Sequence, residues 1–205
     1  MTHTPHTPRA AEATVMPPGE PRKRIPGEAG VWVFIFGDMT VFAVLFTYYL
    51  VERSKQPELF DSSQATLNKD IGAINTVLLL VSSLFVVLAL RASRNSQGRV
   101  ARRALLGAML CGFGFMAIKF VEYFEKLSVG LTPATNDFYM LYFVLTGLHL
   151  FHLIVGLVVL TVARSLVGRP VLTDDQERIV EGCTSFWHMV DLLWLVLFPL
   201  IFLVR

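Results

Sequence analysis

A continuous apolar stretch from Gly30 to Val51, containing the single acid Asp38, limits the possible folds of this chain more than any other feature. A helix needs about 20 residues to cross the hydrocarbon core of a bilayer. Only helices and closed barrels satisfy their backbone hydrogen bonds inside lipid, and the stretch lacks the alternation typical of a strand. We therefore expect a membrane-spanning helix that carries a carboxyl group.

The composition supports a membrane protein and excludes several other classes. Hydrophobic residues make up 54% of the chain and charged residues only 17%, which is too apolar for an ordinary soluble domain. The net charge of +2 gives no indication of nucleic-acid binding. Cys111 and Cys183 lie in or beside apolar runs, without a second thiol at metal or redox spacing, and are interpreted as packing residues.

Five apolar runs predict an all-α, polytopic bundle of five transmembrane helices. They cover residues 30–51, 71–91, 104–124, 137–163 and 183–204. Residues 30–205 are therefore expected to form one membrane domain. Residues 1–29 are rich in proline and threonine, lack the apolar centre of a signal peptide and predict a disordered cytoplasmic tail. The Gln56-Pro57 step is expected to end the first helix, because the residue before a proline disfavours helical backbone.

The distribution of basic residues predicts the orientation. With the N-terminus inside, the inner segments hold twelve lysines and arginines, and the outer segments hold five. Five of the inner ones lie in the single segment from Arg91 to Arg103, which contains no acid. Because cytoplasmic loops carry the excess of positive charge, we expect a cytoplasmic N-terminus and an outer C-terminus.

Ionisable side chains inside the runs are the candidate functional residues, because each costs about 3 kcal/mol or more at the centre of a spanning helix. Asp38 has two interpretations, a hydrogen-bonded acid within the bundle or a site of proton transfer. Lys119 and Glu122 are three residues apart on one helix face and predict an intrahelical ion pair or a snorkelling lysine. Tyr123 adds a polar group beside them.

Two histidine motifs fall at a depth similar to that of Asp38, in the inner half of the membrane. His149 and His152 share a face of the fourth run, and in the fifth run His188 and Asp191 are framed by Trp187 and Trp194. This common depth predicts one polar network between the first, fourth and fifth predicted helices, in which histidines hold the aspartates ionised.

The same residues could serve a metal or haem, since both use histidine ligands. We favour no metal ligation, because these residues recur as short polar pairs flanked by large aromatic side chains. Lipid head groups and neighbouring subunits are alternative partners for these groups, and the residues by themselves do not decide between them. Glycines in the runs predict close helix contacts at some of their positions.

Taken in order, these motifs resemble subunit III of the haem-copper oxidases, in a five-helix form that corresponds to the last five of the usual seven helices. The resemblance covers about residues 26–205. It is carried by the following motifs: GDMTVFAVLF with Asp38, LNKDIGAINTVLLLVSS with Asn75 and Thr76, KFVEYF with Glu122 and Tyr123, TGLHLFHLIVGL with His149 and His152, and FWHMVDLLWL with Trp187, His188, Asp191 and Trp194.

Within the family, the first half of the chain is most similar to the NorE-like branch associated with nitric oxide reductase. The oxidase branch typically has glutamate where this chain has Asp38 and glutamine where it has Lys119.

The resemblance implies an accessory subunit in the bacterial cytoplasmic membrane, with no catalytic residue, metal or redox cofactor of its own. It would pack against oxidase subunit I, or against the catalytic subunit of nitric oxide reductase, with haem and copper or non-haem iron in that partner. It also implies bound phospholipid and support of assembly and proton uptake. Two alternatives remain: a membrane cytochrome using His149 or His152 with His188, and a proton-coupled transporter using Asp38.

Overall fold

The structure, a computed structural model, describes residues 29–169 and 173–204. These residues form helices and no strand. The elements are α1 (Ala29–Lys55), α2 (Pro57–Gln64), α3 (Lys69–Arg94), α4 (Gly98–Ser128), α5 (Asp137–Leu166), α6 (Asp174–Phe198) and a π-helical turn, η1 (Pro199–Leu203). Within these described residues, five helices, α1 and α3 to α6, are long and apolar enough to cross a membrane. The predicted all-helical class and five spans are confirmed.

The helices extend beyond the predicted apolar runs. The largest difference is α6, which begins at Asp174 and not at Cys183. A capping box explains the earlier start, because Thr173 Oγ1 accepts from the Gln176 amide and the Gln176 side chain accepts from the Thr173 amide. The first turns of α6 are polar, so a search for apolar runs misses them. The predicted tail, residues 1–29, lies outside the described residues except for Ala29, which begins α1.

The segment between the first two spans contains a short helix that the sequence did not predict. The first span ends at Lys55, as the Gln56-Pro57 step predicts, and α2 follows with Pro57 in its first turn. Proline is tolerated there because its missing amide would have no partner within the helix. A bond of 3.1 Å from Arg53 to the Asp61 carboxylate ties α2 back to α1.

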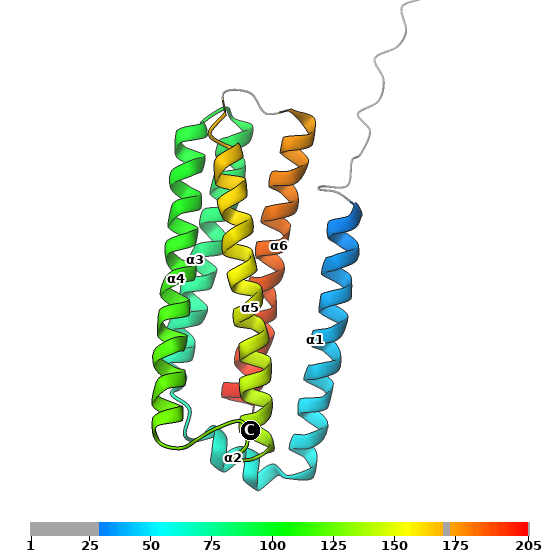
Figure 1. Ribbon diagram of the computed structural model, residues 1–205, viewed down its shortest axis with the longest axis vertical. Coiled ribbons are helices and arrows are strands. Elements are labelled where there is room, and N and C mark those ends of the chain that lie inside the picture. Colours follow the sequence, from blue (N-terminus) through cyan, green and yellow to red (C-terminus); the bar gives the residue numbers. More distant parts are fainter. Residues whose placement is uncertain (1–28, 170–172, 205) are drawn as a thin grey trace, which may run out of the picture.

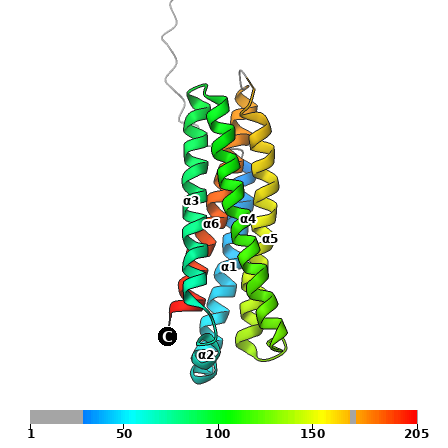
Figure 2. The ribbon, with the colours of Figure 1, turned by 90° about the vertical axis from the view of Figure 1, so that its left-hand side faces the viewer.

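Helices α3, α4, α5 and α6 pack together as a bundle, and α1 stands at its side (Figure 1). α3 and α4 are antiparallel neighbours, and α6 packs against both α3 and α5 (Figure 2). Only 11% of the residues in the apolar stretch of α1 are buried, against 50% for α5 and 56% for the span that begins with α6. The first helix is therefore peripheral, and its contacts with α5 and α6 must position it. The predicted direction of insertion stays a prediction.

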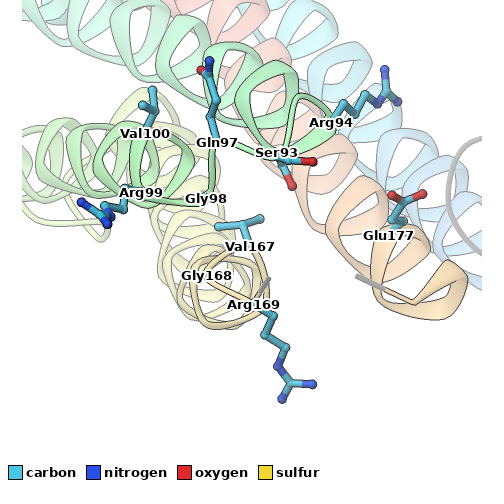
Figure 3. Close-up of a pocket in the computed structure, with 11 residues that line it drawn as sticks. Ser93, Arg94, Gln97, Gly98, Arg99, Val100, Val167, Gly168, Arg169 and Glu177 are labelled. Atoms are coloured by element: carbon cyan, nitrogen blue, oxygen red, sulfur yellow. The ribbon is translucent and has the colours of Figure 1, made fainter. Parts of the chain in front are cut away.

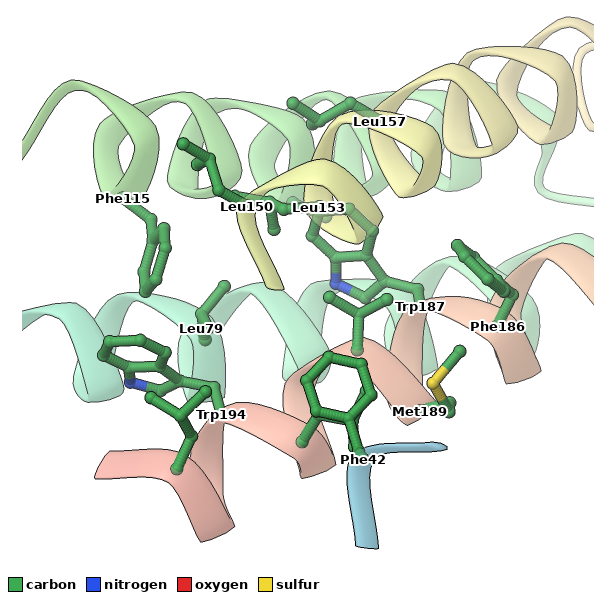
Figure 4. Close-up of a cluster of buried hydrophobic side chains, with 14 of the residues drawn as sticks. Phe42, Leu79, Phe115, Leu150, Leu153, Leu157, Phe186, Trp187, Met189 and Trp194 are labelled. Carbon is green, nitrogen blue, oxygen red and sulfur yellow. The ribbon is translucent and has the colours of Figure 1, made fainter. Parts of the chain in front are cut away.

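Large aromatic side chains fill the core at the centre of the bundle. Trp187 and Trp194 of α6 are fully buried, and Figure 4 shows them with Phe115 of α4 and Phe42 of α1. The rings of Phe115 and Trp194 meet edge to face, with centroids 4.8 Å apart. This geometry is favourable for aromatic pairs and fixes α6 against α4.

Two glycines make room for Trp187. A Cβ atom on Gly156 would lie 2.8 Å from the indole, and one on Gly112 would lie 3.0 Å from it. These contacts place the Trp187 ring of α6 between α4 and α5, as small residues allow in membrane helices. Gly147 is different, because the nearest side-chain atom, the Tyr123 hydroxyl, would be 3.9 Å away. The predicted close contacts therefore occur at some of the glycines and not at others.

Candidate functional site

Asp38 of α1 and His152 of α5 form a polar contact inside the membrane region. His152 Nε2 lies 2.9 Å from Asp38 Oδ1, and the two side chains are 8% and 12% exposed. His152 Nδ1 donates to the Leu148 carbonyl oxygen at 2.7 Å, since a carbonyl can only accept. One proton therefore lies between Nε2 and Oδ1, on the histidine or on the acid. Both ring nitrogens of His152 are engaged, so haem ligation by this residue would break one of the two bonds.

Lys119 and Glu122 form a second buried group, one helical turn apart on α4. Lys119 Nζ donates to Glu122 Oε2 at 2.9 Å, and the hydroxyl of Tyr142 on α5 donates to Glu122 Oε1 at 2.6 Å. Lys119 is 1% exposed. The structure therefore has the intrahelical ion pair, and the snorkelling interpretation is wrong. Each charge is compensated, which a buried ion pair requires.

Aromatic rings enclose the ammonium group of Lys119. Its Nζ lies 4.9 Å from the ring of Trp194, 5.3 Å from that of Phe202 and 5.5 Å from that of Tyr142. The negative faces of such rings attract a cation at these distances. Lysine is therefore held in the core by one carboxylate and three rings.

Tyr123 continues the polar contacts between α4 and α5. The Tyr123 hydroxyl lies 2.6 Å from Thr146 Oγ1. The Thr146 hydroxyl also lies 2.6 Å from the Tyr142 carbonyl oxygen. The threonine donates to the carbonyl, so the tyrosine donates to the threonine.

Polar side chains of α3 pair with both tryptophans of α6. Trp187 Nε1 donates to Ser82 Oγ at 3.1 Å, and Ser82 donates to the Ala108 carbonyl oxygen at 3.0 Å. Trp194 Nε1 donates to Thr76 Oγ1 at 3.0 Å. A buried tryptophan N–H normally finds such an acceptor. These bonds fix the register of α6 on α3 and α4.

His188 and Asp191 also face α3. His188 Nδ1 lies 2.8 Å from Ser83 Oγ and 4.0 Å from Asp191 Oδ2. Asp191 is 4% exposed, and within the described residues its two carboxyl oxygens have no hydrogen-bond partner. The His188 ring at 4.0 Å is more distant than the partners of Asp38 and Glu122, so this buried carboxyl group is compensated less well than theirs.

Asn75 and His149 are fully buried and make no side-chain hydrogen bond within the described residues. The ring of His149 packs against Phe115 and Trp194, with centroids 5.5 and 5.1 Å apart. His149 thus lies among aromatic rings, one turn from His152 but outside its polar contact.

The candidate residues do not form the single network expected from their similar depth. The expected contact between the first and fourth predicted helices is present, as Asp38 with His152, but His188 of the fifth contacts Ser83 of α3. The expectation of one network was wrong because depth along a helix does not specify the direction of a side chain. In the part of the chain that the structure describes, no three His, Cys, Asp or Glu side chains gather as metal ligands.

The residues that complete these contacts are uncharged, so the pattern of charged side chains in the sequence does not indicate them. They are Ser82, Ser83, Tyr142 and Thr146. One sequence signal was present on α5, where Tyr142, Thr146, His149 and His152 recur at helical spacing and define one polar face. The serines of α3 gave no comparable signal.

Comparison with known proteins shows a match over nearly the whole described region. Residues 24–204 match the family described as cytochrome c oxidase subunit III. The cytochrome c oxidase subunit 3 of Synechocystis sp. is 32% identical over 178 residues, which cover 85% of this chain and 74% of the relative. The cytochrome bo(3) ubiquinol oxidase subunit 3 of Pseudomonas putida is 25% identical over 174 residues, 85% of this chain and 84% of the relative.

A third relative is a longer protein. The heme-copper oxidase subunit I+III of Aeropyrum pernix is 26% identical over 187 residues, 86% of this chain and 22% of the relative. All three relatives are named as oxidase subunits. These names do not favour the alternative associated with nitric oxide reductase.

Proposed function

Because the chain belongs to the cytochrome c oxidase subunit III family, we propose that it is a non-catalytic accessory subunit of a haem-copper oxidase. The observation that carries this proposal is the family match, whose residues 24–204 include all five spans. Its role would be to support assembly, lipid binding and proton uptake of the catalytic subunit. The partner would be subunit I, a proposal supported by the Aeropyrum pernix relative, whose name joins subunits I and III.

The exposed faces of the bundle fit a subunit that is covered by a partner or by lipid. On α1, Val33, Phe36 and Val44 are 74%, 63% and 63% exposed. The internal polar groups, in contrast, pair mostly with one another. This division supports a structural role for the buried pairs, and it leaves the apolar faces for contacts inside the membrane.

A groove between α1, α5 and α6 is the place where we propose that a phospholipid chain binds. Its volume is about 460 Å³, and apolar side chains such as Phe34, Val159 and Phe186 line it. Arg178 is the only charged residue among those that line the groove within the described part of the chain. An acyl chain along the apolar walls would place a head-group phosphate near this guanidinium.

The proposed location is the bacterial cytoplasmic membrane, with the N-terminus inside. The arginine-rich segment from Arg91 to Arg103 supports this orientation. We further propose that the five spans correspond to the last five of the seven helices usual in the family. The 178 matched residues are 74% of the Synechocystis relative, which leaves part of that longer chain for further helices.

A mild-detergent pull-down of the tagged chain from native membranes tests the proposal. We expect mass spectrometry to identify an oxidase subunit I and a reduced-minus-oxidised spectrum to show haem. The untagged strain, extracted in the same way, is the control. Recovery of a nitric oxide reductase catalytic subunit would instead assign the chain to the NorE-like branch, and recovery as a free chain without haem would contradict the accessory role.

A further inference from the structure

A basic pocket lies at the end of the bundle where α3 turns into α4, far from the polar pairs described above (Figure 3). Its volume is about 850 Å³, and three arginines from three elements line it: Arg94 from α3, Arg99 from α4 and Arg169 just after α5. One acid, Glu177 of α6, also lines it.

Two glycines bring the start of α4 against the end of α5. A Cβ atom on Gly98 would lie 2.7 Å from the Val167 carbonyl oxygen. The two backbones therefore approach so closely at this point that a residue with a side chain in place of Gly98 would clash. On the other side, a Cβ on Gly168 would lie 2.7 Å from Cδ of Arg102, whose side chain therefore runs across this glycine. The backbone of Gly98 and Gly168 thus lines the floor of the pocket, and the Arg102 side chain covers part of Gly168. Arg94, Arg99 and Arg169 lie beside this floor.

The positive charge is concentrated on one side of the pocket. Arg94 is paired with Glu181 at 2.8 Å, and Glu177 lies on the same side. Arg99 and Arg169 have no carboxylate within ion-pair distance among residues 29–169 and 173–204. In Figure 3 their side chains leave the backbone on either side of Gly98 and Gly168 and point outward. Binding of one anion by both guanidinium groups requires these exposed side chains to rotate about their stems toward Gly98.

The backbone adds to the positive potential of that side. α4 is 31 residues long and begins at Gly98, and its N-cap residue, Gln97, makes no side-chain capping bond. The first amides of a helix have no partner within the helix, and the helix dipole makes this end positive. Together with two unpaired arginines, these amides offer donors to a single anion.

We infer that this pocket binds a phosphate group between Arg99 and Arg169, over Gly98. Arginine favours phosphate because its planar group donates two parallel hydrogen bonds. The pocket lies at the ends of three spans, at Arg94, Gly98 and Leu166, where we expect the lipid head groups. The phosphate could belong to an anionic phospholipid or to a soluble molecule. The inference is independent of the proposed accessory role.

Native mass spectrometry of the full-length chain in mild detergent tests the site, with phosphatidylglycerol and phosphatidylcholine of the same acyl chains as probes. We expect preferential retention of phosphatidylglycerol. The double variant R99Q/R169Q should weaken that binding about thirtyfold, because each arginine near an anionic head group contributes about 1 kcal/mol. The matched control is R91Q/R103Q, which removes two exposed arginines of the same segment that do not line the pocket.

The outcomes distinguish a specific phosphate-binding site from general attraction of anionic lipids to positive charge. An equal loss in both double variants, or equal retention of the two lipids, would overturn the inference. Inorganic phosphate distinguishes the two sources of the anion. If millimolar phosphate displaces phosphatidylglycerol from the wild type and binds R99Q/R169Q more weakly, the site accepts soluble phosphate; if it fails to displace the lipid, the site is specific for the head group.

Discussion

His152 Nε2 lies 2.9 Å from Asp38 Oδ1, and this contact joins α5 to the peripheral helix α1 inside the membrane. α1 buries little of its apolar surface, so a single polar pair has a large share in determining where it docks. In contrast, α6 is held by two tryptophans, each hydrogen-bonded to α3. The two helices therefore depend on different interactions for their positions.

Removal of the Asp38 carboxyl group should weaken the docking of α1. Asp38→Leu leaves Nε2 of His152 buried without a partner, and we expect a loss of about 2 kcal/mol in the free energy of unfolding. Asp38→Asn keeps a hydrogen-bonding side chain and should cost about 1 kcal/mol or less. Denaturation in mixed micelles measures both. Thr40→Val is the control on the same helix, because Thr40 is exposed and its side chain bonds to the Phe36 carbonyl of its own helix. Equal effects of all three substitutions would refute the role of the contact between Asp38 and His152 in the docking of α1.

Asp191 should tolerate loss of its charge better than Asp38, although both side chains lie inside the membrane region. Its carboxyl oxygens have no hydrogen-bond partner within the described residues, and burial of such a group is unfavourable. We expect Asp191→Asn to change stability by less than about 1 kcal/mol or to raise it. The same denaturation assay measures this. A loss as large as that of Asp38→Leu would show that Asp191 has a stabilising partner in the assembled protein.

The buried pair of Lys119 and Glu122 should show strong coupling in a double-mutant cycle. Lys119→Met leaves Glu122 with only the Tyr142 hydroxyl, and Glu122→Gln leaves an uncompensated ammonium group; each should cost about 3 kcal/mol. The combined variant should recover more than half of the summed loss, because no unpaired charge remains. Unfolding of the four proteins in one detergent measures the coupling. Additive losses would mean that the two charges act independently.

Gly156 should not tolerate a larger side chain. A Cβ on Gly156 would meet the rigid indole of Trp187 at 2.8 Å, so Gly156→Ala should destabilise the bundle by about 1 to 3 kcal/mol through overpacking. Gly147→Ala on the same helix is the control, because its new methyl group would find its nearest neighbour at 3.9 Å. Thermal unfolding followed by tryptophan fluorescence compares them. Equal melting temperatures for the two variants would contradict the close packing of the Trp187 indole against Gly156.

The sequence was sufficient for the number and type of the spans, because each one must bury its own backbone in lipid and therefore shows a long apolar run. It also predicted the end of the first helix, through Gln56-Pro57. The ion pair of Lys119 and Glu122 was one of two interpretations that it offered, since residues three apart on a helix are neighbours regardless of the rest of the fold. It missed α2 and the first turns of α6, because these segments are polar and lie outside the apolar runs.

Tertiary structure alone decided which helices share polar contacts. His152 and His188 have comparable surroundings in the sequence, yet one contacts Asp38 of α1 and the other Ser83 of α3. The basic pocket likewise depends on the close approach of Gly98 to Val167. Periodicity and composition describe one helix at a time. Contacts between helices depend on the rotation of each helix about its axis, which packing around residues such as Trp187 determines.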